Sequence, residues 1–156
     1  MGDNKNASAL QAKRVAPKID KRLYDTIYAE VGGGDPKEVA AVTSVFLNRV
    51  DKEGYEKALK GSTAYRKKSK EYIKALTGGM TAYEKQVYLR NKGIVDTLIS
   101  KPELIAPFTH FENVDAFREP SWAKDMESST DIGRQRFYKK KVKEKKNVLN
   151  NNAVSN

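Results

Sequence analysis

Apolar side chains recur at helical spacing through the first two thirds of the chain. Leu23, Ile27 and Val31 follow one another at intervals of four residues, which places them on one face of a helix. This pattern predicts a helix over residues 17–32. Three consecutive glycines at 32–34 would end it, because glycine accepts the backbone conformations found at helix C-termini.

A second helix start follows directly. Asp35 is a typical N-cap residue, Pro36 suits the first helical turn, and Glu38 stands three residues after the cap. The apolar pattern continues to about Val50, and Gly54 would close the helix. The sequence therefore predicts two successive helices separated by the glycine-rich break.

Three further helices are predicted downstream, over residues 55–60, 66–76 and 81–98. Residues 61–65 would separate the first two. Thr81 and Glu84 have the spacing of a capping box at the start of the third. Lys101 and Pro102 would end it, because proline disfavours helix at the preceding residue.

The pattern changes after Pro107. Residues 109–138 hold scattered aromatic side chains without sustained helical periodicity, which is typical of functional loops. We therefore expect a mostly α fold, α+β at most, as a single domain over residues 17–138 with an irregular aromatic-rich face. Residues 1–16 are expected to form a flexible arm, and the basic, Asn-rich residues 139–156 a tail that is disordered unless bound.

Composition narrows the class of protein. The 156 residues contain no cysteine, and 30 Lys and Arg against 20 Asp and Glu give a net charge of +10. No apolar run is long enough to cross a membrane, and the N-terminus lacks the apolar core of a secretory signal. The positive charge favours a polyanionic partner: nucleic acid, an anionic membrane face or a bacterial cell wall. No motif of the kind that reads nucleic acid supports the first of these.

Glu30 is the leading candidate for chemistry. It lies three residues after Ile27 and next to the glycine break, so it would project near the apolar stripe and be partly desolvated. Desolvation raises a carboxyl pKa, which suits an acid that protonates a glycosidic oxygen. The alternative is a helix-end glutamate paired with Arg22, Arg49 or a lysine.

Other chemistries find less support. His110 is the only histidine, so the usual zinc sites are excluded, and the chain has no serine in a nucleophile elbow. We expect neither metal nor cofactor, and the glycines at 32–34 lack nucleotide-binding spacing. Three side chains stay open: His110 as core or cleft wall, Glu112 as a second carboxylate or a solvent-facing residue, and Trp122 as a sugar platform or a core residue.

Ordered motifs resemble a known family. Residues 23–50 read LYDTIYAEVGGGDPKEVAAVTSVFLNRV and are similar to the opening of the SleB-type cell wall hydrolases, spore-cortex-lytic enzymes with a lysozyme-like fold. Further similarity follows in the same order: Ser62-Thr63-Ala64-Tyr65, Thr109-His110-Phe111-Glu112-Asn113, Pro120-Ser121-Trp122-Ala123 and Ile132-Gly133-Arg134-Gln135-Arg136-Phe137-Tyr138. The resemblance covers roughly residues 20–138.

The resemblance implies cleavage of peptidoglycan glycan strands between N-acetylmuramic acid and N-acetylglucosamine, by a lytic transglycosylase or muramidase reaction. Glu30 matches the family's catalytic glutamate. The implied substrate-binding residues are Ser62, Tyr65, Thr109, His110, Phe111, Glu112, Asn113 and Trp122. Val31 and the three glycines stand where the family has Ala-Arg-Gly-Glu, so its second acidic residue is missing, and Gln135 replaces a usual histidine.

These expectations fit a phage protein that is carried in the virion or released from the host cytoplasm at lysis. Residues 139–156 would then bind the cell wall or other virion proteins. The departures from the family pattern motivate one alternative, a catalytically inactive structural virion protein that retains the lysozyme-like fold.

Overall fold

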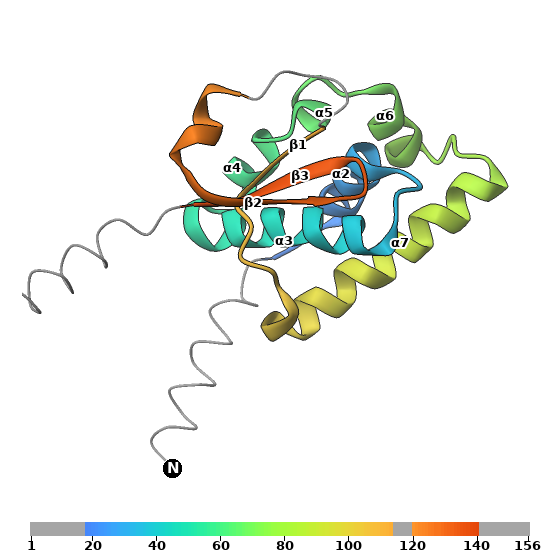
Figure 1. Ribbon diagram of the computed structural model, residues 1–156. Helices are drawn as coiled ribbons and strands as arrows, with labels where there is room; N and C mark the ends of the chain where they lie inside the picture. Colours follow the sequence, from blue (N-terminus) through green and yellow to red (C-terminus); the bar gives the residue numbers. More distant parts are fainter. Residues whose placement is uncertain (1–17, 114–119, 141–156) are drawn as a thin grey trace, which may run out of the picture.

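A computed structural model describes residues 18–113 and 120–140 of the chain (Figure 1). Its helices are α2 (Lys21–Val31), α3 (Pro36–Glu53), α4 (Tyr55–Lys60), α5 (Thr63–Arg66), α6 (Lys70–Thr77) and α7 (Ala82–Ser100), with short 3₁₀ turns η1 (Pro102–Leu104) and η2 (Ser121–Asp125). The strands are β1 (His110–Asn113), β2 (Met126–Ile132) and β3 (Gln135–Lys140). Within the described residues the protein is a mostly helical α+β structure.

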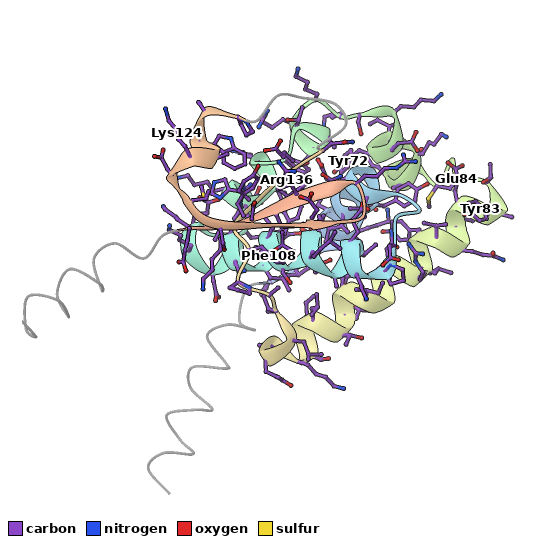
Figure 2. The ribbon with its side chains drawn as sticks, viewed as in Figure 1. Tyr72, Tyr83, Glu84, Phe108, Lys124 and Arg136 are labelled. Atoms are coloured by element: carbon purple, nitrogen blue, oxygen red, sulfur yellow. The ribbon has the colours of Figure 1, made fainter. Side chains whose placement is uncertain are left out.

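Local capping chemistry explains where the helices begin. The Asp35 side chain accepts a hydrogen bond from the Lys37 amide at 2.8 Å, as expected from the sequence. Thr81 and Glu84 form the predicted reciprocal capping box at the start of α7, where Glu84 is labelled in Figure 2. The first helix begins later than predicted, at Lys21, because Asp20 is its N-cap.

Two helix boundaries in the middle of the chain were predicted wrongly. Residues 63–65, expected as part of a linker, form α5 together with Arg66, and Ser62 is its N-cap. The following helix begins at Lys70 instead of residue 66, because Lys68 has a positive φ of 50° and Ser69 caps the new helix. The chain therefore changes direction between α5 and α6 at Lys68.

The expected irregular face is a three-stranded antiparallel sheet of order β1-β3-β2. Phe111 is paired with Phe137, and Thr130 lies opposite Phe137 on the other side. The strands were missed because they are four to seven residues long and β2 is mostly exposed and polar. Lys139 and Lys140 belong to β3 instead of the predicted tail, and residues 1–16 and 141–156 lie outside the described residues.

The core forms around α3. Its Val42 and Phe46 are essentially inaccessible and pack with Leu23 of α2, Val95 of α7 and Phe137 of β3. Figure 1 shows the sheet lying across α3. Burial of large apolar side chains is the main term that favours the folded state, so α3 is the element that joins the helices to the sheet.

Polar side chains of α3 hold the segment that leads into β1. Ser44 Oγ accepts from the amide of Ala106 at 3.0 Å, and Asn48 Nδ2 donates to the carbonyls of Ala106 and Phe108 at 2.8 Å. Arg49 Nε donates to the Thr109 carbonyl at 2.9 Å. These bonds provide partners for backbone groups that would otherwise make no hydrogen bond within the protein. They also set the position of β1 relative to α3.

None of the helices in the described part of the chain is long and apolar enough to cross a membrane.

The turn between β2 and β3 generates a stability prediction. Gly133 has a φ of +60°, and a Cβ there would lie 2.3 Å from Glu38 Oε1. Gly133→Ala should therefore destabilise the protein by at least about 1–2 kcal/mol, because the left-handed conformation alone costs that much for a non-glycine residue. Thermal or urea unfolding measures the change.

Gly93 provides the matched control, since it lies in α7 and a Cβ there meets nothing within 4 Å. Gly93→Ala should stabilise the protein by about 0.5–1 kcal/mol. Equal effects of the two alanines would contradict the role assigned to the turn.

Candidate active site

Two hollows meet at Glu30. The first, here called the α5-side hollow, has a volume of about 610 Å³ and is lined by residues that include Arg49, Ser62, Lys67 and Phe111. The second, the hairpin-side hollow, has a volume of about 500 Å³, and its lining includes Asp35, Glu38 and Arg134. Both hollows share Glu30, Asn113 and Gln135. The two hollows are therefore adjacent, with Glu30 on their common border, and together they are called the groove below.

Glu30 stands in the last turn of α2. Gly32 ends this helix with a φ of 48° and donates its amide to the Tyr28 carbonyl at 2.7 Å. The Glu30 side chain is half-buried. Its Oε1 accepts a hydrogen bond from Ser62 Oγ at 2.6 Å.

Ser62 holds this carboxyl group in a fixed orientation. It is buried at the N-terminus of α5, and its Oγ also accepts from the Tyr65 amide at 3.2 Å. Because a serine hydroxyl has one proton, accepting from Tyr65 leaves that proton for Glu30. Among the described residues no hydrogen bond reaches Glu30 Oε2, so this oxygen is free to carry or take a proton in the groove.

The alternative interpretation, in which Glu30 is a surface glutamate paired with a cation, finds no ion pair within the described residues. Arg22 pairs with Asp20 and Glu56 at 2.9 and 2.8 Å. Arg49 lies close enough to be attracted by Glu30, but its Nε donates to the Thr109 carbonyl. Glu30 is thus held by a neutral hydroxyl.

The sequence-predicted site residues divide into two groups. Ser62, Phe111, Glu112 and Asn113 line the groove together with Glu30. The other four, Tyr65, Thr109, His110 and Trp122, are not among the residues that line either hollow. Their assignment to substrate binding, which came from the family resemblance, stays a prediction.

Those four residues have structural contacts instead. Tyr65 stacks edge-on against Tyr72 with ring centroids 5.6 Å apart and accepts from Arg22 at 3.2 Å. Thr109 bonds through its hydroxyl to His110 Nδ1 at 2.9 Å. The Trp122 ring lies 4.9 Å from that of His110 and 5.0 Å from that of Tyr138.

Glu112 was considered as a second catalytic carboxylate. Its Oε2 accepts from the Tyr138 hydroxyl at 2.6 Å, and Glu112 and Tyr138 lie on β1 and β3. The proximity of the carboxylate raises the pKa of Tyr138, in addition to the larger effect of burial, to about 12. Glu112 is therefore engaged with the sheet although it borders the groove.

Sequence reasoning missed several residues of the groove. Glu38 was assigned only to the helix start, yet its side chain is 4% exposed and its Oε1 accepts from the Arg134 amide at 3.4 Å. Gln135 was noted only as a departure from the family pattern, and it is buried between the two hollows. Its Oε1 has no hydrogen-bond partner in the described part of the chain. One feature of the sequence could have indicated that Glu38 is buried: it directly precedes Val39, which is also buried.

Comparisons of the chain with protein-family models, curated proteins and solved structures found no match. Within residues 18–113 and 120–140, no group of three or more His, Cys, Asp or Glu side chains is placed to hold a metal ion.

His110 generates a pH prediction. Burial lowers its pKa from the ordinary 6.5 to about 4, and Arg49, Lys140 and Lys52 add repulsion, partly opposed by Glu53. Between these two values the unfolded chain binds more protons than the folded one. Stability should therefore fall as the pH is lowered from 6.5 to 4, by about 1–2 kcal/mol after allowance for solvent exposure of the ring.

Urea unfolding at several pH values measures how the free energy of unfolding changes with pH. The substitution His110→Gln should make this slope flatter between pH 6.5 and 4. The carboxyl group of Asp20, whose pKa its bond to Arg22 lowers to about 2, contributes a separate loss below about pH 4 in both proteins. An unchanged slope in the variant would contradict the assignment to His110.

Proposed function

We propose that this protein cleaves the glycan strands of peptidoglycan, with Glu30 as the acid and then the base. One observation carries the proposal: Glu30 lies on the common border of two adjacent hollows. A polymer that passes through both hollows must cross this carboxyl group. Cleavage inside a strand requires that arrangement.

The reaction follows from the free oxygen of Glu30. With its proton on Oε2, the carboxyl group donates to the glycosidic oxygen as the bond from that oxygen to the anomeric carbon breaks. Ser62 keeps Oε1 in place throughout. The resulting carboxylate then takes a proton from the nucleophile, which is either the muramic 6-hydroxyl, giving an anhydro ring, or a water molecule.

The other acidic groups of the groove favour the intramolecular route. An inverting hydrolase needs a second carboxylate that activates water about 6.5–9.5 Å from the acid. Asp35 is engaged by the Lys37 amide, Glu38 is buried against the hairpin, and Glu112 binds Tyr138. We therefore infer a lytic transglycosylase that works with a single glutamate.

Zymography on purified cell walls and mass spectrometry of the released fragments test the proposal. The unchanged protein should release anhydro-ended fragments, and Glu30→Gln should lower the rate at least about a hundredfold, because general acid catalysis contributes on that scale. Ser62→Ala should retain some activity but lower the rate, since it frees the carboxyl group to rotate.

Glu103→Gln is the matched control, because it neutralises an exposed carboxylate that lines neither hollow and should change the rate little. Absence of cleavage by the folded, unchanged protein would overturn the proposal and favour the alternative of an inactive structural virion protein. Reducing ends in place of anhydro ends would retain Glu30 and reject the intramolecular route.

A further inference from the structure

The two halves of the groove differ in charge. Arg49 and Lys67 border the α5-side hollow together with Glu112, which is bound by the Tyr138 hydroxyl, whereas Asp35 and Glu38 border the hairpin-side hollow together with Arg134. Glu30 lies between the two halves. A strand that carries negative groups on alternate sugars would therefore meet different fields on the two sides of the cleavage point.

In the described part of the chain, the Arg49 guanidinium makes a hydrogen bond through its Nε only. Its Nε donates to the Thr109 carbonyl at 2.9 Å, which ties the guanidinium to the start of β1. Within the described part of the chain its two Nη groups have no hydrogen-bond partner, and no carboxylate lies within 4 Å of them. Burial is the main cause that lowers the pKa of Arg49, opposed by attraction to Glu53 and Glu30. A partly buried cation with free donors is an anion-binding group.

Gly61 provides the space for this guanidinium. Its φ of -67° and ψ of -18° are conformations that any residue adopts, so the backbone does not require glycine. A Cβ at this position would, however, lie 2.7 Å from Arg49 Nη1. The absence of a side chain at position 61 therefore allows Arg49 to lie against the end of α4 and border the hollow.

The fork of donors on a guanidinium matches a carboxylate better than it matches a hydroxyl or an acetamido group. Peptidoglycan alternates a neutral amino sugar with muramic acid, whose lactyl group ends in a carboxyl group that is either free or joined to an acidic peptide. Chitin has the same linkage between neutral sugars and no carboxylate. The free donors of Arg49 thus provide a means to distinguish the two polymers.

We propose that Arg49, assisted by Lys67, binds a carboxylate of the substrate in the α5-side hollow, so that the acidic sugar lies on this side of Glu30 and the neutral sugar lies in the hairpin-side hollow. This inference rests on the proposed function, because it assigns the substrate class and orientation of the same groove. Arg49 is then the residue that determines specificity, and Glu30 retains the chemistry.

Binding to the full chain with Glu30→Gln tests the proposal without turnover. The probes are peptide-free strands with free lactyl carboxylates, the same strands with these groups reduced to alcohols, and chitohexaose. Carboxylate-bearing strands should bind at least about tenfold more tightly than the other two, since a charge-assisted hydrogen bond contributes on that scale. Adding Arg49→Gln should remove the difference.

Two further variants keep the test meaningful if Arg49→Gln unfolds. Gly61→Ala retains every charge but displaces the guanidinium, and it should reduce the preference. Lys67→Gln should reduce it partly. Arg66→Gln is the matched control, because Arg66 donates to the Lys60 carbonyl and the Thr63 hydroxyl; this variant should keep the preference.

Peptide-bearing strands distinguish the two sources of the carboxylate. Tight binding of peptide-free strands assigns it to the lactyl group, and Arg49-dependent binding of peptide-bearing strands alone assigns it to the peptide. Equal binding of all probes, or a preference that survives in folded Arg49→Gln and Gly61→Ala, overturns the inference.

The outcomes separate the two proposals. Equal cleavage of native and carboxyl-reduced strands by the unchanged protein would leave the glycosidase function standing and reject the role of Arg49. Arg49-dependent binding of carboxylate strands without any cleavage would support the binding site and reject the catalytic proposal.

Discussion

The position of β1 against α3 is the constraint on which the rest of the structure depends. Ser44, Asn48 and Arg49 of α3 bind backbone groups of Ala106, Phe108 and Thr109. β1 follows this segment directly. The bonds therefore hold β1 next to α3, although helices α4 to α7 lie between the two in the sequence. Without them Phe111 and Asn113 would not face the end of α2, and the groove would lack one wall. Asn48 and Arg49 thus have a structural role in this chain.

The groove combines a neutral partner for its carboxyl group with charged side chains further away. Ser62 orients Glu30 through a short hydrogen bond without adding a charge, whereas Arg49 acts on the same group only through space. Orientation and charge thus come from different elements: α5 is capped by the serine that binds Glu30, and α3 carries the arginine that acts on it through space.

Much of the helical part of the fold could be predicted, because its signals are local. Gly54 and the Thr81–Glu84 capping box act within one turn of their own helices, and α4 and α7 follow the predicted limits closely. The strands could not be predicted in this way. Met126–Ile132 is polar and exposed along most of its length, and only pairing with β3, which lies on the far side of the Gly133 turn, stabilises it as a strand. The helix break before Ser69 was also missed. It follows from the left-handed backbone conformation of Lys68, which the pattern of apolar residues does not indicate.

The sequence by itself determined the helical framework and singled out Glu30, since spacing along one helix is enough to place a carboxylate beside an apolar stripe. Tertiary structure alone decided which side chains surround it. Ser62 is 32 residues from Glu30 and Asn113 is much further, and no local pattern reports such a distance. It also separated Tyr65 and Trp122 from the groove and brought Arg49, Lys67 and Glu38 to it. Helix formation depends on neighbours one turn away, whereas a groove is formed where distant segments pack, and packing is decided by the whole chain at once.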